Sequence, residues 1–342
     1  MSTIIAIDTG YGNTKYCRRV GGNLQCDLFP SFAPLAQSGS LEAIDRDGGR
    51  AMVVVEVDGS KYEVGPEVYD HLPGQFTRIL DPDYAKSDQY LALVRGALAM
   101  CRRTDPLLQN VDVLVVGLPL DTYVDRQAEL AKRLVGAHPL PRIDPRAKAE
   151  IRVGTVFVLP QPVGALLGDL TQDSSPRALN RTTLVVDVGF GTLDWYLGVG
   201  LRPSSRQCGS ARFGVARVLE EVARAISPRA ATDDRVHRRI DEAMRQRQPS
   251  VTVAGKDHHL NDYEGVVRSV ARLGLAAMLR SVERLDSIDR VLLTGGGAAF
   301  YAEGLRDMFG DRVVIDPDPV FGNVKGFAAY GQSRLMRSAV AA

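Results

Sequence analysis

The sequence predicts an α/β protein made of two similar halves. Three observations support this prediction: strands alternate with helices along the 342 residues, one strand–turn–strand pattern occurs twice, and a further strand enters three consecutive glycines. The length suits two domains. Apolar residues make up 45% and charged residues 24% of the chain, ordinary values for a globular protein.

The first half is expected to begin with a buried strand, because residues 3–7 are a continuous and mostly β-branched run. Residues 13–20 can return as a second strand. Residues 53–57 and 61–64 flank Asp58-Gly59, a hairpin-turn dipeptide. Apolar residues at helical spacing predict a helix over 84–102, followed by a central strand at 112–118 and a helix over 122–135.

The second half repeats this succession. Strands are expected at 151–159, 182–186, 193–199, 291–294 and 313–315. Helices are expected at 162–170, 214–226, 262–285 and 322–338, and Pro162 suits a first helical turn. Residues 228–260 are polar and variable. Within them the arginine-rich stretch 235–247 reads as an exposed helix of mixed charge, or alternatively as a filament or adaptor contact.

Two segments match each other: IIAIDTGYGNTKY at 4–16 and LVVDVGFGTLDWY at 184–196. Each has an apolar strand, then Asp-x-Gly-x-Gly, then a second strand. Their aspartates, Asp8 and Asp187, lie 179 positions apart, about half the chain, so an internal duplication is the simplest interpretation. One such loop alone could equally be a plain hairpin turn.

The repeated loop has the chemistry of a phosphate site. Its glycines permit positive φ and a close backbone approach, so that successive N–H groups can point into one anion-binding concavity. An aspartate at the strand end needs a divalent cation between itself and a phosphate, and Mg²⁺ usually keeps its waters. We therefore expect Asp8 and Asp187 to bind Mg²⁺ through water molecules.

A third element is Val291-Leu-Leu-Thr-Gly-Gly-Gly297, which precedes a predicted helix. A strand entering a glycine turn at a helix N-terminus is suited to phosphate and ribose. The pattern GxxxxGK[ST] is absent from the sequence, and no GxGxxG follows a strand, which disfavours the P-loop and Rossmann classes.

With these motifs the chain resembles the superfamily of actin, sugar kinases and heat-shock chaperones. Five motifs occur in that superfamily's order: DTGYGNTK (8–15), LPQPVGALLG (159–168), DVGFGTLDW (187–195), LLTGGGAAF (292–300) and GNVKGFAAYG (322–331). Within that superfamily the chain resembles the ParM/StbA plasmid-segregation actins most, in the segments YEVGPEVYD (62–70), DQYLALVRGAL (88–98) and VVGLPLDTY (115–123). FPSFAPL (29–35) and FGTLDW (190–195) are similar to the PRTRC system protein D family.

The resemblance implies two duplicated actin-like (ribonuclease H-like) domains with mixed five-stranded sheets, flanked by helices, and ATP or ADP with Mg²⁺ in the cleft between them. Domain I would be 1–162 plus 324–342 with an insert at about 27–80, and domain II would be 163–323 with an insert at about 212–285. Gln161 would orient the attacking water, and Lys15 would reach the β-phosphate. The other nucleotide contacts would be Gly10, Tyr11, Gly12, Asn13, Thr14, Gly189, Phe190, Gly191, Thr192, Gly295, Gly296 and Gly297.

Several of these residues could instead have an ordinary structural role. Lys15 could be a surface lysine at a strand end, and Gln161 in Pro-Gln-Pro could cap a helix turn. Phe190 stands where many relatives have a small residue. Asp194 reads as structural, Trp195 as a core residue, and His258-His259 as a solvated loop rather than a metal site.

The function implied is a slowly hydrolysing ATPase that assembles into nucleotide-dependent filaments for plasmid or DNA segregation, with further protomers and a DNA-binding adaptor as partners. The alternatives are a non-polymerising switch or reactivase, and a small-molecule kinase, which would need an acidic base where Gln161 stands.

Bulk properties exclude other classes. The net charge of +1 argues against strong direct nucleic-acid binding by the whole molecule. The start of the chain lacks the features of a signal peptide, and no segment has the length and apolarity to span a membrane. Cys17, Cys26, Cys101 and Cys208 form no CxxC pair, so the sequence predicts reduced thiols and a cytoplasmic location.

Overall fold

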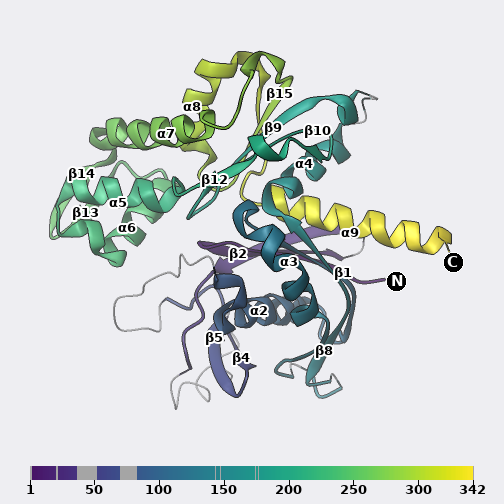
Figure 1. The fold of residues 1–342 in the computed structure, drawn as a ribbon. Coiled ribbons are helices and arrows are strands. Elements are labelled where there is room, and N and C mark those ends of the chain that lie inside the picture. Colours follow the sequence, from purple (N-terminus) through teal and green to yellow (C-terminus); the bar gives the residue numbers. More distant parts are fainter. Residues whose placement is uncertain are drawn as a thin grey trace. The chain divides into compact units, whose positions relative to one another are not determined.

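The computed structural model describes residues 2–20, 22–36, 52–69, 83–142, 144–146, 148–173, 175 and 177–341. Contacts divide these residues into two compact units (Figure 1). Unit 1 holds the described residues up to 173 together with 321–341, and unit 2 holds 175–320. The chain thus passes between the units near residues 174 and 320. The sequence analysis places the domain boundaries at 162/163 and 323/324 instead.

Unit 1 contains a mixed sheet in the order β3-β2-β1-β6-β8-β7. Strands β1, β6 and β8 run parallel, and the remaining pairs are antiparallel. The strand bounds are β1 (Ile4–Thr9), β2 (Asn13–Val20), β3 (Asn23–Pro30), β6 (Asn110–Leu118), β7 (Gly136–Pro139) and β8 (Glu150–Pro160), with the hairpin β4 (Val53–Val57) and β5 (Ser60–Val64) outside this sheet.

Helices cover both faces of the unit 1 sheet (Figure 1). On one face lie α2 (Asp88–Thr104) and α3 (Leu120–Leu134), with the short helix η1 (Tyr84–Lys86) before them. On the other face lies α9 (Gly322–Ala341), packed against α4 (Gln161–Gln172). Because successive strand side chains point to opposite faces, Ile5 and Ile7 of β1 join the α2 core, whereas Ile4 and Ala6 join the α9 core.

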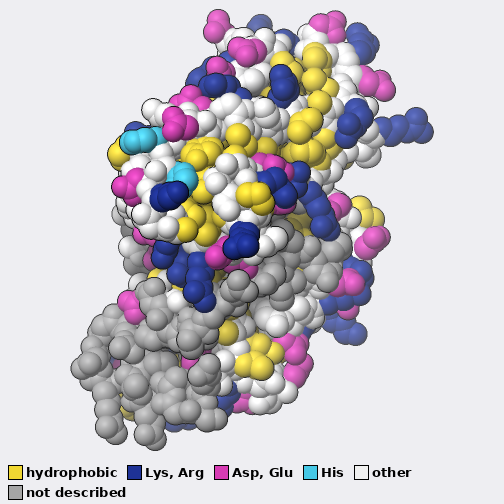
Figure 2. All heavy atoms as spheres, turned by 90° about the vertical axis from the view of Figure 1, so that its left-hand side faces the viewer, with side chains coloured by type: hydrophobic (Ala, Val, Ile, Leu, Met, Phe, Trp, Pro, Cys, Tyr) yellow, Lys and Arg dark blue, Asp and Glu magenta, His cyan; other side chains and the backbone are white. Residues whose placement is uncertain are grey.

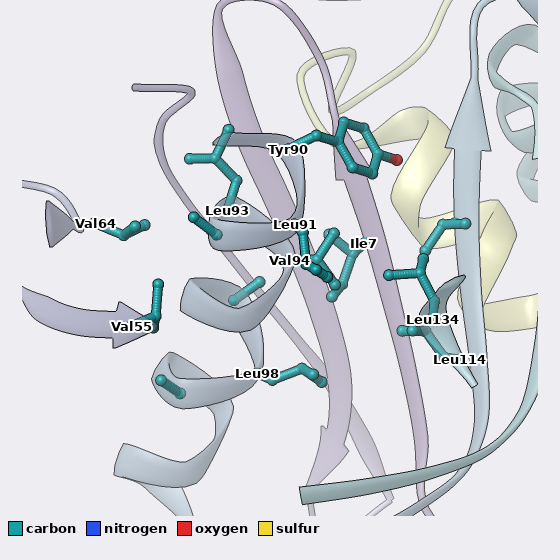
Figure 3. Packing of buried hydrophobic residues seen from close by; sticks show 14 of the residues in the cluster. Ile7, Val55, Val64, Tyr90, Leu91, Leu93, Val94, Leu98, Leu114 and Leu134 are labelled. Carbon is teal, nitrogen blue, oxygen red and sulfur yellow. The ribbon is translucent and has the colours of Figure 1, made fainter. Parts of the chain in front are cut away.

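Figure 3 shows the α2 core at close range, with Leu91 and Val94 of the helix beside Ile7 of β1. Tyr90 and Leu93 in the same helix are at most 1% exposed. The opposite layer depends on glycines, because a Cβ on Gly326 of α9 would lie 1.7 Å from the carbonyl oxygen of Gly164 in α4. The two helices therefore cross in backbone contact, which a side chain at this point would prevent.

Unit 2 contains the sheet β11-β10-β9-β15-β16, with β12 paired to β10. Its strands are β9 (Thr182–Val188), β10 (Leu193–Val199), β11 (Arg202–Pro203), β12 (Gly209–Ala211), β15 (Arg290–Thr294) and β16 (Val313–Ile315). Helices α7 (Glu264–Leu279) and α8 (Ala298–Phe309) pack on one face of the sheet. The 3-10 helices are η2 (Ala178–Asn180), η3 (Ser205–Gln207), η4 (Ala230–Thr232), η5 (Leu260–Tyr263), η6 (Leu285–Ser287) and η7 (Gly310–Arg312).

A second core of unit 2 lies under α5 (Val215–Ile226), α6 (Asp234–Arg245) and the hairpin of β13 (Ser250–Val253) and β14 (Lys256–His259). Residues 228–260 are therefore more regular than the sequence analysis expected, although the predicted mixed-charge helix at 235–247 is present as α6. Figure 2 shows Lys and Arg mixed with Asp and Glu on the face that carries these elements. This mixture fits an ordinary exposed helix surface.

The α/β fold with mixed sheets is confirmed, but the predicted number of strands in each main sheet is wrong. Each of the two main sheets has six strands rather than five, and the short strands β7, β11 and β12 were not recognised in the sequence. Gly10, Gly12, Gly189 and Gly191 do not adopt positive φ. The part of the predicted insert at 27–80 that falls in 37–51 and 70–80 lies outside the described residues.

The prediction of four reduced thiols is also wrong, since Cys17 and Cys26 form a disulfide. They lie directly opposite each other on antiparallel strands β2 and β3, with Cα atoms 4.1 Å apart. That separation falls close to the usual range for disulfide-linked cysteines. Cys101 and Cys208 are free. Among the described helices, none combines the length and apolar character required to cross a membrane.

Candidate functional site

The first loop is built around the buried carboxylate of Asp8, which is 1% exposed at the end of β1. Lys15 lies opposite Asp8 on β2, and its Nζ donates to Asp8 Oδ2 at 3.0 Å. Gln161 directly follows β8, and its Nε2 donates to Asp8 Oδ1 at 2.7 Å. These groups meet because the carboxyl ends of parallel strands β1, β6 and β8 share one sheet edge.

Both oxygens of Asp8 thus already accept hydrogen bonds from within unit 1. Each carboxylate oxygen keeps a further acceptor site. This arrangement fits the expected contact with a hydrated cation, in which Asp8 would accept from a metal-bound water rather than bind the metal directly.

Space for the Gln161 side chain depends on Gly117 of β6. A Cβ at position 117 would lie 3.1 Å from Gln161 Cγ and 2.6 Å from the Phe327 ring. The backbone of Gly117 does not have positive φ, so this glycine is required by close packing alone. Its role was missed from the sequence, although it ends an apolar strand in Gly-Leu-Pro.

The loop after Asp8 is held by the end of β3. The Ser31 N–H donates to the carbonyl of Gly12 at 3.0 Å, and the hydroxyls of Ser31 and Thr14 are hydrogen-bonded at 2.9 Å. A Cβ on Gly10 would lie 3.3 Å from the Asn13 carbonyl oxygen. The glycines therefore allow the backbone of this loop to close tightly on itself.

Tyr11 ties the same loop to the helices that follow. Its ring packs on Tyr84 of η1, with 5.5 Å between ring centroids, and Tyr84 meets Tyr90 of α2 edge to face at 5.5 Å. Such tilted and edge-to-face contacts are favourable geometries for aromatic rings. The first loop is thereby braced against α2 by three tyrosines in succession.

The second loop follows β9 in unit 2, where Asp187 is 4% exposed. Asp194 on β10 lies directly opposite Asp187, at the position that Lys15 occupies opposite Asp8. Asp194 Oδ2 accepts from the Thr192 hydroxyl at 2.6 Å, and the Gly189 N–H donates to the Thr192 carbonyl at 2.9 Å. The two halves share a frame but differ in charge at this pair of positions.

The glycine turn after β15 packs directly on the second loop. Gly295 has a φ of +87°, and a Cβ there would lie 2.4 Å from Asp187 Oδ1. The Gly297 N–H donates to the carbonyl of Val188 at 2.9 Å. A glycine is therefore required at position 295 both for its backbone conformation and for the approach to Asp187.

The second loop also holds the start of α5. The N–H groups of Val215 and Ala216 donate to the carbonyls of Gly189 and Phe190, at 3.0 and 2.8 Å. A Cβ on Gly214 would lie 2.5 Å from the Phe190 oxygen. The first N–H groups of a helix need partners from outside the helix, and here the loop supplies them.

Each unit thus gathers part of the predicted site. Unit 1 brings together Asp8, Lys15 and Gln161 beside Gly10, Tyr11, Gly12, Asn13 and Thr14. Unit 2 brings together Asp187 with Gly189, Phe190, Gly191, Thr192, Gly295, Gly296 and Gly297.

Other residues behave as ordinary structural groups. Trp195 is buried and donates to the Ser281 hydroxyl, and His258 pairs with the Tyr263 hydroxyl. Within the described residues, no group of three His, Cys, Asp or Glu could hold a metal ion by itself.

Comparison with known protein families gives two matches. The model for "Actin like proteins N terminal domain" matches residues 6–164, and that for "Archaeal actin homologue MreB-like, C-terminal" matches residues 185–307. Curated proteins give no significant match.

Solved structures with the same fold include three that differ in their bound state. The protein of a 15-stranded ParM filament from Clostridium botulinum is 18% identical in sequence to this chain. The match covers 97% of this chain and 99% of that chain, with a TM-score of 0.77. Ta0583, an archaeal actin homologue solved with ADP, is 19% identical, with coverage of 98% and 100% and a TM-score of 0.73. ParM from Bacillus thuringiensis with AMPPNP is 15% identical, with coverage of 98% and 99% and a TM-score of 0.66.

Two actin-like family models thus match successive parts of this chain, and its fold is that of solved actin homologues. Structures of similar fold include ParM proteins and an archaeal actin homologue.

Proposed function

We propose that this chain binds Mg-ATP, hydrolyses it slowly, and uses the nucleotide to control assembly into filaments. The observation that carries the proposal is the repeated strand–Asp-x-Gly-x-Gly–strand loop, one in each unit, with Gln161 hydrogen-bonded to Asp8 in the first. The relatives with ADP and AMPPNP provide supporting examples on this fold.

The backbone N–H groups of the two loops would bind phosphate oxygens, together with the side chains of Asn13, Thr14 and Thr192. Lys15 would contribute positive charge near the β-phosphate, from its position 3.0 Å from Asp8. The glycines at 295–297 would contact ribose and α-phosphate. Asp8 and Asp187 would hold Mg²⁺ through water, and the bound cation would offset the negative charge of the phosphates.

Gln161 would orient the attacking water. Its Nε2 is committed to Asp8, which leaves Oε1 as the acceptor that a water molecule can reach. An amide cannot accept a proton as a carboxylate can, so Gln161 orients water without deprotonating it. The chemistry would therefore be slow, as suits a switch whose two nucleotide states must persist.

Partners follow from the same proposal. We infer further copies of this chain as filament neighbours, as in the filament of the ParM relative, and a DNA-binding adaptor that would link filaments to a plasmid or other DNA. The near-neutral net charge of +1 supports an adaptor rather than strong direct contact with DNA.

Phosphate release and light scattering with Mg-ATP test the proposal, with electron microscopy of the same samples. Asp8→Asn, Gln161→Ala and Asp187→Asn should each slow phosphate release at least about tenfold, whereas Asp262→Asn, at an exposed site in η5, should match the wild type. Filaments should form with Mg-ATP and disassemble with Mg-ADP.

Each contrary result has a defined meaning. Unaltered hydrolysis in Asp187→Asn and Asp8→Asn would remove the assignment of the site. Hydrolysis without assembly at any concentration would leave a non-polymerising switch. Consumption of ATP that requires a small acceptor molecule would instead indicate a kinase.

A further inference from the structure

A cavity lies in unit 1 beside the first loop, between the ends of β1 and β6 and the starts of α2 and α4. Its volume, measured as the space open to the centre of a water molecule, is about 20 Å³, and it is partly open to solvent. Gly10 and Gln161 line it together with Thr9, Tyr84 and Tyr90. The free space exceeds the minimum that one water molecule needs.

Three buried hydroxyls in this wall make no hydrogen bond of full geometry within the described part of the chain: Thr9 Oγ1, Tyr84 OH and Tyr90 OH. Tyr90 OH lies near Thr9 and Tyr84 OH near Ser31, which leaves hydrogen-bonding capacity of all three open to water. Their residues are 4%, 8% and 1% exposed. Buried hydroxyls are nearly always hydrogen-bonded, so three with unused capacity in one cavity are unexpected unless something binds them. Figure 3 shows the Tyr90 ring at the start of α2 with its hydroxyl directed away from the helix.

Water is the ligand that fits this wall. None of its described lining residues is a lysine or an arginine, so it lacks the charge that would attract an inorganic anion. Burial raises the pKa of the Tyr84 and Tyr90 hydroxyls, so both remain protonated and can donate as well as accept at neutral pH. A buried water typically makes two to four hydrogen bonds, which hydroxyls of this kind can provide.

We propose that Thr9, Tyr84 and Tyr90 bind ordered water in this cavity, and that this water fixes the orientation of Gln161. The catalytic part rests on the proposed ATP hydrolysis. One end of the Gln161 amide is already held by Asp8 through Nε2. A cavity water that donates to Oε1 holds the other end, while the second lone pair of Oε1 remains for the attacking water.

Thr9, Tyr84 and Tyr90 are then positioning residues, because they act on the reaction through Gln161. The tilted and edge-to-face contacts among the rings of Tyr11, Tyr84 and Tyr90 keep the two phenol hydroxyls in place relative to the loop. This arrangement predicts that loss of one hydroxyl lowers the rate of the chemical step without changing the affinity for nucleotide.

Tyr90→Phe tests the proposal, since it removes one oxygen and keeps the ring. In a crystal structure of the nucleotide-free protein, ordered water should lie within hydrogen-bond distance of Tyr90 OH or Thr9 Oγ1, and Tyr90→Phe should lose it. The variant should lower kcat for ATP about 3–10-fold, as expected for one hydrogen bond, with KM unchanged. Thr9→Val should act in the same direction.

Tyr196→Phe is the matched control. Tyr196 in β10 is 3% exposed and its hydroxyl also has no partner among the described residues, but it lies in unit 2 and does not line this cavity. Its kcat and KM should equal those of the wild type.

A dry cavity in the crystal structure would overturn the water site, as would a Tyr90→Phe variant that is more stable than the wild type and equally active. Bound water together with an unchanged kcat would overturn the role toward Gln161. If the wild type does not hydrolyse ATP at all, the proposed function fails, and the crystal structure still decides the water site.

Discussion

Gly214 is the position where a single methyl group should disturb the second loop most directly. A Cβ there would lie 2.5 Å from the Phe190 oxygen and 2.7 Å from the Gly189 oxygen. Contacts below 3.0 Å essentially never occur for real Cβ atoms, so the backbone must separate by roughly half an ångström or more. The φ of −77° is one that alanine can adopt, so the predicted effect of Gly214→Ala comes from crowding alone.

Two estimates of the cost agree. Forcing an extra methyl group into a packed site typically costs about 1–3 kcal/mol. The two hydrogen bonds from the start of α5 to Gly189 and Phe190 are worth about 0.5–1.5 kcal/mol each, or about 1–3 kcal/mol together. At about 2–4 °C for each kcal/mol, Gly214→Ala should lower Tm by roughly 2–12 °C.

Thermal unfolding with and without Mg-ADP measures both consequences. A ligand that binds the folded state raises Tm by an amount that grows with the logarithm of its affinity, so the variant should also show a smaller gain from Mg-ADP than the wild type. Gly265→Ala is the control, because Gly265 lies in the first turn of α7 with no neighbouring atom within 4 Å of an added Cβ. Alanine is the better helix former, so this variant should be more stable by about 0.4–1 kcal/mol.

A Gly214→Ala variant with the Tm of the wild type would refute the crowding argument. A lowered Tm with an undiminished Mg-ADP effect would show instead that the loop tolerates displacement of α5 without loss of binding.

Two further predictions concern protonation and thiols. Burial lowers the pKa of His138, so the unfolded chain takes up a proton at His138 more readily than the folded chain does. The contribution of His138 to folding stability is therefore complete above its unfolded pKa of about 6.5 and is lost as the pH falls below that value. Tm should therefore fall from pH 7 to 5, and more steeply for the wild type than for His138→Gln; equal slopes would exclude His138 as a cause. Alkylation of the unfolded, unreduced protein should modify two thiols, Cys101 and Cys208, and four after reduction, whereas four without reductant would mean that Cys17 and Cys26 are not bonded.

The sequence was most informative where one residue pattern has a single structural meaning. The predicted strands at 182–186 and 193–199 correspond to β9 and β10, and the repeated loop lies between them. The glycine turn at 295–297 lies against the second loop, as expected of a shared site. These features are local, or follow from comparing the two halves of the chain with each other.

What could not be predicted depends on contacts between distant residues. Asp8 and Gln161 are 153 positions apart and meet only because β1, β6 and β8 are neighbouring parallel strands. The Cys17–Cys26 bond requires the register of β2 and β3, which spacing alone does not give. Gly10 and Gly189 could serve through positive φ or through close backbone approach, and only the structure shows that they do so by leaving room for the loop backbone.

The residue pairs that face each other at the ends of β1 and β9 make the two units differ in formal charge. In unit 1 an aspartate faces a lysine, so the formal charges of this pair cancel; in unit 2 an aspartate faces another aspartate, so they add. The two units therefore carry unequal formal charge at one pair of matching positions. A substitution at one of these positions is therefore not equivalent to the corresponding substitution in the other unit, because the facing residue has the opposite charge in unit 1 and the same charge in unit 2.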